Sequence, residues 1–448
     1  FVSRTWMEQK IDEWLAKSDS SQYLLMYGGP GTGKSAFSAH YFHFNSKVVG
    51  SVFCEWGCRN YSSASQIIKS IAYQIALKLP TYRMRLAGIL ENCGRDLSAY
   101  SVQELFDLLL LKPLYGDTAE DRIILVIIDG VDEANEFSGN ELAEVLSEYS
   151  SRIPSFLKIL LTSRNDSIVQ RYFSDCEQLH IDIHTDENNG DIYRYLKEQL
   201  WDIMDDYPKW RREQVLREFA RKSGSSFLYA ELLVKSVRSE AVSVDQADAV
   251  PKGLNGLYFN WMRRKFPDEM QYEEEYAPAL SLIAAVNQLP VRMLDKTIGM
   301  KGIKFRKFMR RLKTFLETEE NVFGEECVYF FHKSFAEWLC SENADVYELS
   351  AEDGMQMLAE TMADSYANND LTDFEAEHLL EYLQESHMYE LYRKVSSDGR
   401  YLQRLYQLAQ HCESLSGGYE HALRLYEKIA MFLKNTDPED RELQGLRC

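Results

Sequence analysis

The stretch "QYLLMYGGPGTGKSAF", Gln22 to Phe37, decides the fold of this chain. An apolar run of strand length leads into a loop that fits the pattern G-x-x-x-x-G-K-[ST]. In this pattern glycines let backbone N–H groups approach phosphate oxygens, and the dipole of the following helix adds to the attraction. Lys34 would reach the β- and γ-phosphates, and the Ser35 hydroxyl would ligate Mg²⁺. The stretch predicts a nucleotide-binding loop made of Gly28, Gly29, Pro30, Gly31, Thr32, Gly33, Lys34, Ser35 and Ala36.

Composition indicates a soluble globular protein of several domains. A length of 448 residues predicts two to four domains, and 45% hydrophobic with 27% charged residues is typical of soluble chains. No apolar run approaches the roughly 18 residues that span a bilayer, and no signal peptide opens the chain. The net charge of −20 disfavours nucleic acid as a partner. We therefore expect a cytoplasmic protein without a membrane span.

The eight cysteines show no repeated spacing. Cys54 and Cys58 in "CEWGC" resemble half of a metal site, but no second Cys/His pair stands at a matching distance. Reduced thiols are the better interpretation, and they fit a reducing cytosol.

Short apolar strands alternate with helical segments over residues 1–184. The expected strands are residues 22–27, 47–56, 122–129, 157–163 and 177–183, with helices from Lys34, over 63–79 and near 139–150. Near-continuous apolar strands separated by helices are typical of a parallel sheet that is covered on both faces. The sequence therefore predicts an α/β nucleotide-binding domain over residues 1–184.

The remainder of the chain reads mainly as helices. Apolar residues at helical spacing predict a helical domain over 185–270. Over 271–345, helices are followed by two strand-like runs that flank Gly324, which predicts a winged-helix domain.

Residues 346–448 are predicted to form a helical arm. Its end resembles a tetratricopeptide repeat, with an ordinary helical extension as the alternative. The matching positions are Gly417, Tyr419, Ala422 and Tyr426.

A second acidic motif follows an apolar strand in "ILVIIDGVDEA", Ile124 to Ala134. Asp129, at the strand end, would present a carboxylate to the metal ion at the edge of the sheet where ligands bind. Asp132 and Glu133 would orient or polarise a water toward the γ-phosphate. Acidic residues also cap helices, so a structural role for this group is the alternative.

A third strand, "LKILLTSRND" (Leu157 to Asp166), ends near the same edge. Thr162, Ser163 and Arg164 would emerge close to the phosphates. The Arg164 guanidinium can sense a γ-phosphate through a charge-assisted hydrogen bond. A solvated arginine at the rim of the sheet is the alternative.

With these three motifs in place, the chain resembles a STAND-class P-loop ATPase of the NACHT clade. "DGVDE" at Asp129 carries the resemblance, with "FVSRTWMEQKIDEWL" before the P-loop, "SGSSFLYAELL" and "VPKGLNGLY" in the helical domain, and "FFHKSFAEWL" in the winged helix. The resemblance covers about Phe1 to Cys340 in the family's order. The residues beyond Cys340 resemble the helical, often repeat-bearing arm of such proteins.

The resemblance implies a signalling switch in defence or regulation. ADP would hold a closed monomer, and exchange for ATP on detection of a ligand by the C-terminal arm would allow homo-oligomerisation, with slow hydrolysis. It further implies that Pro251 packs near the adenine, that His332 contacts the diphosphate and that Arg4 lies near the nucleotide. Ser3 stands where the family more often has Gly. From the residues alone, His332 would be a core histidine.

Two other hypotheses remain open at this point. A DNA-handling ATPase of the AAA+ type would use the winged helix to bind a duplex, and a purely structural module would carry a degraded nucleotide site. Intact Lys34, Ser35 and Asp129 argue against the degraded site. Because the chain begins at Phe1 rather than Met, we expect it to be part of a longer protein, with any effector domain before Phe1.

Overall fold

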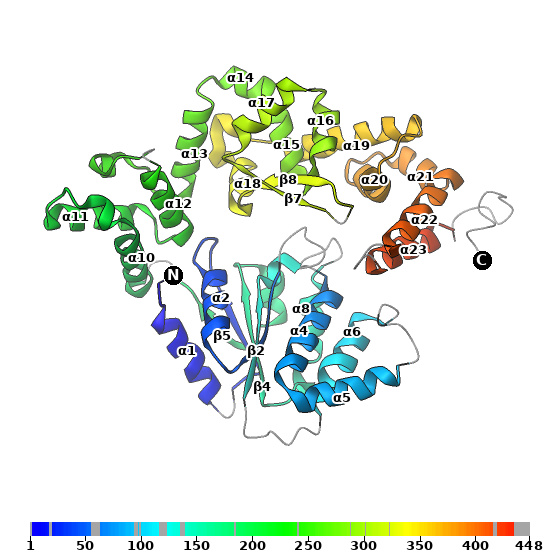
Figure 1. The fold of residues 1–448 in the computed structure, drawn as a ribbon, viewed down its shortest axis with the longest axis horizontal. Helices are drawn as coiled ribbons and strands as arrows, with labels where there is room; N and C mark the ends of the chain where they lie inside the picture. Colours follow the sequence, from blue (N-terminus) through cyan, green and yellow to red (C-terminus); the bar gives the residue numbers. More distant parts are fainter. Residues whose placement is uncertain are drawn as a thin grey trace. The chain divides into compact units, whose positions relative to one another are not determined.

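A computed structural model provides the fold (Figure 1). By contacts the chain divides into two compact units, Phe1–Trp261 and Met262–Cys448, which are considered separately below. The structure describes residues 2–17, 20–54, 63–93, 97, 100–115, 123–134, 139–182, 185–239, 242–286, 288–300, 302–321, 323–414 and 419–433. Cys58 and Gly417, on which two of the sequence-based expectations rest, lie outside these residues.

A five-stranded parallel sheet forms the centre of the first unit, in the order β2-β3-β4-β1-β5. Its strands are buried apolar runs, except for the edge strand β5, whose residues alternate between half-buried and exposed. The predicted parallel α/β sheet is therefore confirmed. The strand bounds are β1 Tyr23–Tyr27, β2 Val48–Phe53, β3 Ile124–Asp129, β4 Leu157–Ser163 and β5 Glu177–His180.

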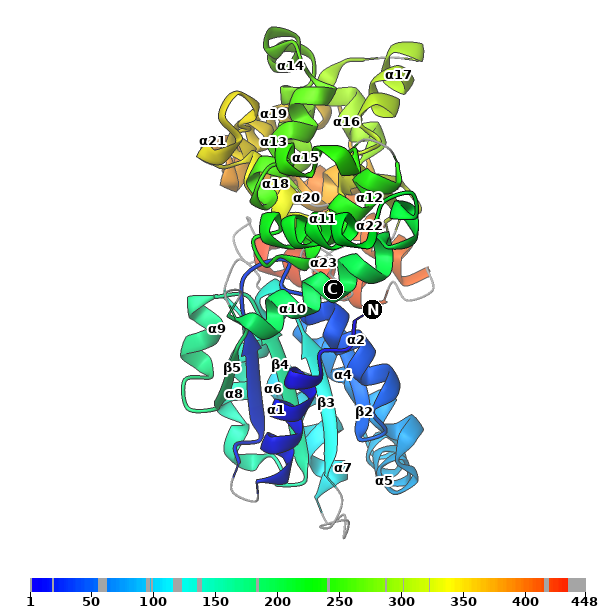
Figure 2. The same ribbon diagram turned by 90° about the vertical axis from the view of Figure 1, so that its left-hand side faces the viewer.

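Helices cover both faces of this sheet. Successive residues of β3 point to opposite faces, so that Val126 belongs to one apolar cluster and Ile127 to the other. One cluster includes α4 and α8, and the other includes α1 and α2, on opposite sides of the sheet in Figure 1. Figure 2 shows α1 in front of the strands. The helices are α1 Thr5–Ala16, α2 Lys34–Phe44, α4 Ala64–Lys78, α5 Pro80–Glu91, α6 Val102–Leu105, α7 Lys112–Leu114, α8 Glu141–Glu148 and α9 Ser167–Tyr172, with a π-helix at Phe106–Leu111 and 3-10 turns at Val131–Ala134 and Ser150–Arg152.

Helices follow β5 to the end of the first unit, and the last of them, α13, continues into the second unit. Residues 212–237 of the predicted helical domain carry apolar residues at helical spacing, but they form two helices because the chain turns at Gly224 (φ 56°) and Ser225 (φ 65°). A left-handed conformation ends a helix, and it is uncommon for a residue with a Cβ such as Ser225. The helices are α10 Asp186–Leu200, α11 Lys209–Lys222, α12 Phe227–Arg238 and α13 Gly253–Lys265, with 3-10 turns at Asp202–Met204 and Val244–Ala249.

The second unit begins with helices around a small antiparallel sheet, in the order β6-β8-β7. β7 and β8 pair on either side of a turn at Gly324, whose φ is 73°. The chain thus forms a hairpin where the sequence suggested one, and the winged helix itself stays a prediction. The elements are α14 Glu269–Glu275, α15 Ala277–Ala285, β6 Leu289–Pro290, α16 Val291–Ile298, α17 Ile303–Leu312, β7 Leu316–Glu320, β8 Glu326–Phe330 and α18 Lys333–Leu339, then a 3-10 segment at Glu342–Tyr347.

The last helices continue this unit. α19 packs closely on α15 at Gly354, where a Cβ would lie 2.1 Å from the Ser281 carbonyl oxygen. The Lys296 ammonium contacts the buried Glu375 carboxylate at 2.8 Å, which ties α16 to α20. The helices are α19 Ala351–Ala367, α20 Asp373–Glu385, α21 Tyr389–Ser396, α22 Gly399–Ser414 and α23 Tyr419–Leu433. None of the helices that the structure describes is both long and apolar enough to cross a bilayer.

Candidate nucleotide-binding site

The glycine loop follows β1, a strand that lies between β4 and β5 in the sheet. β3 lies next to β4, so the carboxyl ends of β1, β3 and β4 meet at one edge of the sheet. Asp129 ends β3, and Arg164 follows the last residue of β4. The sheet order therefore brings the three predicted motifs together at the edge where ligands of open parallel sheets bind.

Two glycines of the loop have conformations that other residues avoid. Gly31 has a φ of 70° and Gly33 a φ of 84°, and Gly33 is the N-cap of α2. A Cβ on Gly31 would lie 2.7 Å from Ser226 Oγ and 2.8 Å from Leu228 Cβ. The Phe227 N–H donates to the Gly31 carbonyl oxygen at 2.8 Å. The loop thus packs directly against the start of α12, which the sequence did not reveal.

The Lys34 ammonium lies against its own loop. Nζ donates to the Gly28 carbonyl oxygen at 2.8 Å and to the Gly29 carbonyl oxygen at 3.0 Å. Burial lowers the pKa of Lys34 to about 8, although the Asp132 and Asp129 carboxylates oppose the shift. This cation is therefore poorly solvated, and a phosphate would stabilise its charged form.

Asp129 is 3% exposed and is held by hydroxyl groups. Its Oδ1 accepts from Thr162 Oγ1 at 2.7 Å and from Ser38 Oγ at 2.9 Å, and Ser35 also bonds to this carboxyl group. Burial raises the pKa of Asp129, and these hydrogen bonds counteract that rise. The Ser35 hydroxyl and the Asp129 carboxylate are thus adjacent, as the predicted magnesium site requires.

This pair of oxygen donors fits Mg²⁺. The ion prefers oxygen ligands and is commonly held by one or two protein side chains together with water and substrate phosphates. In the residues that the structure describes, no group of three or more His, Cys, Asp or Glu side chains is placed to hold a metal ion. A site made of Ser35, Asp129 and phosphate oxygens needs no such group.

The predicted sensor and the predicted water-orienting acids lie together. The Arg164 backbone N–H donates to Asp132 Oδ1 at 3.0 Å. Its guanidinium lies 3.7 Å from the Asp132 carboxylate and 3.6 Å from the Glu133 carboxylate. The three side chains stand beside the loop as one charged cluster, and their catalytic roles stay predictions.

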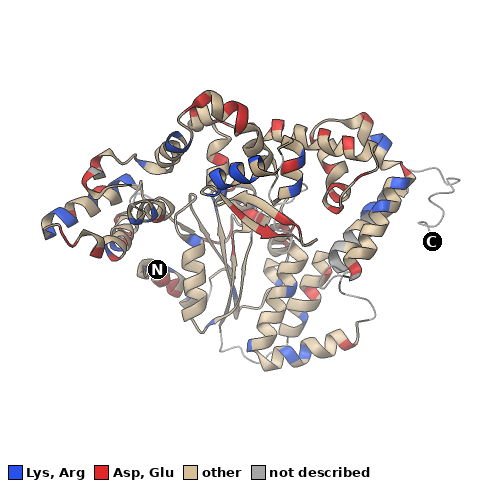
Figure 3. Ribbon diagram, turned by 45° about the horizontal axis from the view of Figure 1, so that its top comes forward, with Lys and Arg blue, Asp and Glu red and all other residues tan. Residues whose placement is uncertain are grey.

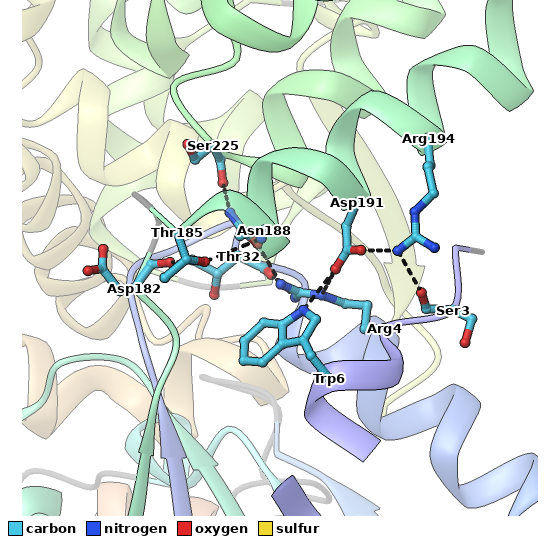
Figure 4. Close-up of polar contacts among 10 residues, drawn as sticks. All are labelled: Ser3, Arg4, Trp6, Thr32, Asp182, Thr185, Asn188, Asp191, Arg194 and Ser225. Carbon is cyan, nitrogen blue, oxygen red and sulfur yellow. Dashed lines mark hydrogen bonds and ion pairs between the residues drawn. The ribbon is translucent and has the colours of Figure 1, made fainter. Parts of the chain in front are cut away.

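Arg4 joins the loop to α10 (Figure 4). This side chain is 2% exposed, and its Nη1 donates to the Thr32 carbonyl oxygen at 2.6 Å. Nε donates to Asp191 Oδ2 at 3.2 Å, and Nη2 donates to Asn188 Oδ1. Trp6 Nε1 donates to the same Asp191 oxygen at 3.0 Å. All three guanidinium nitrogens therefore bond to protein groups. The contact of Arg4 with the loop is the observation that supports its predicted position near the nucleotide.

Asn188 and Asp191 are the functional candidates that sequence reasoning missed. Both are buried on α10, and the Asn188 amide also donates to the Ser225 carbonyl oxygen at 3.0 Å. One feature of the sequence could have pointed to them. The two polar residues stand one turn apart on the face of α10 that also buries Ile192.

Two predicted nucleotide contacts have defined structural partners. The Pro251 carbonyl oxygen accepts from the Tyr229 hydroxyl group, which anchors the segment before α13 to α12. His332 is the N-cap of α18, where Nδ1 accepts from the Ser334 N–H at 3.0 Å. His332 belongs to the second unit, so its contact with a diphosphate stays a prediction.

The sheet order, the loop and the residues around it define a P-loop nucleotide-binding fold. The family model described as "Nephrocystin 3, N-terminal" matches residues 3–164, so this part of the chain is similar to that family. No curated protein matches the chain.

The solved structures that match this chain do so at low similarity. The Walker-type ATPase PABY2304 of Pyrococcus abyssi is 13% identical, with a TM-score of 0.39, over 75% of this chain and 95% of that one. Cdc6p of Pyrobaculum aerophilum is 13% identical, with a TM-score of 0.35, over 80% and 94%. The Orc1 protein of Aeropyrum pernix in complex with DNA is 14% identical, with a TM-score of 0.33, over 83% and 95%. Because these scores are low, the class of fold rests on the geometry described above.

Proposed function

We propose that this protein is a nucleotide-operated signalling switch of the STAND type. It binds ADP or ATP with Mg²⁺, hydrolyses ATP slowly and changes its assembly with the nucleotide bound, in the cytoplasm. The observation that carries this proposal is the contact of the loop with the helices after the sheet, through Arg4 to α10 and through Gly31 to α12. In a loop packed in this way, binding of a nucleotide changes the contacts that the loop makes with another part of the chain.

Binding begins with the loop amides and Lys34. On arrival of the phosphates, Lys34 Nζ exchanges its bonds to the Gly28 and Gly29 carbonyl oxygens for bonds to β- and γ-phosphate oxygens. Ser35 and Asp129 would hold Mg²⁺, which would supply neutralisation of phosphate charge. Asp129 is kept in place for this role by Thr162 and Ser38.

Hydrolysis needs an oriented water molecule. Asp132 or Glu133 accepts a hydrogen bond from this water as its oxygen attacks the γ-phosphorus. The bond to the β–γ bridging oxygen breaks, and the products are ADP and inorganic phosphate. Arg164 contacts both acids, so a γ-phosphate that binds the arginine competes with these two carboxylates. Such a competition favours the slow turnover that suits a switch.

The switching cycle follows the family that the sequence resembles. ADP holds a closed monomer with Pro251 near the adenine and His332 at the diphosphate. A protein or other ligand bound to the helices α19–α23 permits exchange for ATP, and the open form assembles with further copies of itself, in defence or regulatory signalling. The domain boundaries 1–184, 185–270, 271–345 and 346–448 belong to the same proposal.

The test measures bound nucleotide and phosphate release in the full chain. We expect about one equivalent of nucleotide per chain, and we expect Lys34→Ala to lose it. Glu133→Gln or Asp132→Asn is expected to keep the nucleotide while phosphate release slows at least about tenfold. Retention by Lys34→Ala contradicts the assignment of the loop, and normal turnover in both acid variants removes Asp132 and Glu133 from the mechanism.

A second candidate function is a DNA-handling ATPase, which the charge of α17 favours (Figure 3). The basic residues of this helix are Lys304, Arg306, Lys307, Arg310 and Arg311. The next element of the chain, β7, exposes Glu317, Glu319 and Glu320, which would repel a phosphate backbone. Duplex binding that weakens steeply with salt would favour this second candidate over the switch.

A further inference from the structure

A separate cavity of about 700 Å³ lies in the first unit among α10, α11 and the segment before α13. Arg217 and Arg221 line it from α11, and Lys252 lines it from the chain just before α13. Gly190 and Tyr193 of α10 belong to another part of its lining. The volume lies within the range of small-molecule sites, about 300–1,000 Å³.

The lining of this basic cavity is strongly positive. It contains three cations and no Asp or Glu among the described residues, in a chain whose net charge is −20. Arg221 pairs with Glu218, which is not part of the lining. Over the residues that the structure describes, Arg217 and Lys252 have no ion-pair partner. A merely solvated basic helix would place its charges along one element, whereas these cations converge from two segments.

We propose that the basic cavity binds a small polyphosphate, that is, a compound with two or more neighbouring phosphate groups. Guanidinium groups bond phosphate oxygens in pairs, and a lysine ammonium adds a point charge. Two phosphates carry enough negative charge to balance Arg217 and Lys252 and to compete with Glu218 for Arg221. Next to Tyr193, the side of the cavity at Gly190 carries no side chain and leaves room for the organic part of the compound. No residue of the P-loop lines this cavity, so the phosphates of a nucleotide in the P-loop do not occupy it.

The position of the cavity links it to the P-loop. Ser225 lines the cavity, and the next residues, Ser226 to Leu228, contact Gly31 of the loop. The Ser225 carbonyl oxygen also accepts from Asn188, which holds Arg4. An occupant of the cavity therefore touches the turn against which the nucleotide loop packs.

Titration calorimetry on the full chain tests this proposal, with Lys34→Ala as the background that removes nucleotide from the P-loop. Inositol hexakisphosphate and ADP are the two probes, so that a non-nucleotide source and a nucleotide source are distinguished. We expect one equivalent of at least one probe to bind. The double variant Arg217→Ala/Lys252→Ala is expected to bind it at least about tenfold more weakly, since each cation supplies a charge-assisted hydrogen bond.

Two further variants separate a site from general electrostatic attraction. Gly190→Phe should also weaken binding, because a Cβ there meets no atom within 4 Å and Gly190 lines the cavity, so the ring takes up part of its space. Lys209→Ala removes one positive charge from α11 outside the lining, half of the charge that the double variant removes, and we expect binding within about twofold of the background.

Unchanged thermal unfolding midpoints would verify that these variants fold. The proposal is overturned when neither probe binds, when Lys209→Ala weakens binding as much as the double variant, or when Gly190→Phe has no effect. Retention of nucleotide by the P-loop of the wild-type chain is measured separately. A failure of the polyphosphate proposal is therefore distinguished from a failure of the proposed nucleotide switch.

Discussion

Lys34 shows how a single buried charge prepares the site for phosphate. Its ammonium bonds two carbonyl oxygens of its own loop, and burial lowers its pKa from the ordinary 10.5 to about 8. Below pH 8 the lysine is charged in both the folded and the unfolded chain, so the burial penalty is fully present. Between pH 8 and 10.5, Lys34 is deprotonated in the folded chain and still protonated in the unfolded chain. Its contribution to the free energy of unfolding therefore rises with pH.

Nucleotide binding should have the opposite pH dependence. Because phosphate favours the charged ammonium, we expect affinity to fall by up to about tenfold per pH unit above 8, with proton uptake on binding. Calorimetry in buffers of different ionisation enthalpy measures both effects. Lys34→Arg keeps its charge at these pH values and serves as the control, with a flatter profile. A wild-type affinity that does not change between pH 7 and 9 would contradict this account of Lys34.

Gly31 and Gly29 offer a matched pair of substitutions within the loop. Gly31→Ala should weaken nucleotide binding at least about tenfold, because its Cβ would collide with Ser226 and Leu228 and its φ of 70° disfavours alanine. A Cβ on Gly29 meets no protein atom within 4 Å, so Gly29→Ala tests only the approach of the phosphates, and its loss should be smaller than that of Gly31→Ala. Equal losses in the two variants, measured by nucleotide titration, would mean that packing on α12 does not shape the loop.

At the scale of elements, the Arg4 network fastens α10 to the loop. Replacing Arg4 by Met leaves Asp191 and Asn188 buried with fewer partners, so we expect a loss of about 3–5 kcal/mol in unfolding free energy. Urea unfolding measures the loss. Adding Asp191→Leu to the Arg4→Met chain should recover part of it, because the buried carboxylate, which then keeps only Arg194 and Trp6 as partners, is gone. A loss below about 1 kcal/mol for Arg4→Met would show that the network is not structural.

Most elements of the first unit could be predicted from sequence, because buried strands are continuous apolar runs. Leu157–Ser163 is a strand at the predicted residues. The predicted strand over 47–56 ends earlier, at Phe53, although the Cys54 N–H still bonds the Asp129 carbonyl oxygen. The helical pattern over 212–237 concealed the turn at Gly224, because the apolar spacing continues on both sides of it.

The site could be predicted only where its residues stand in contiguous motifs. Lys34, Ser35 and Asp129 were named from sequence and lie together. The partners of Arg4 could not be named, since Asp191 is 187 positions away and only the folded chain brings it near. Likewise, nothing in the pattern of α12 indicated that its first residues pack on Gly31.

At the scale of the whole molecule, the two units must cooperate for the chain to act as a switch. His332 is the second-unit residue that would contact the diphosphate, but it also caps α18. His332→Asn separates these roles, because asparagine is a good N-cap and lacks the imidazole ring. We expect ADP release to accelerate about tenfold in His332→Asn, with an unchanged unfolding midpoint. ADP release at the wild-type rate would leave His332 only its capping role.

The central claim is that the bound nucleotide sets the assembly of this protein. The most direct test is the mass of the chain in solution by light scattering, with Mg²⁺ and either ADP or a non-hydrolysable ATP analogue. The account predicts a monomer with ADP and a larger assembly with the ATP analogue, and it predicts that Lys34→Ala does not respond. Equal masses in both nucleotides, with occupancy of the P-loop demonstrated, would contradict it.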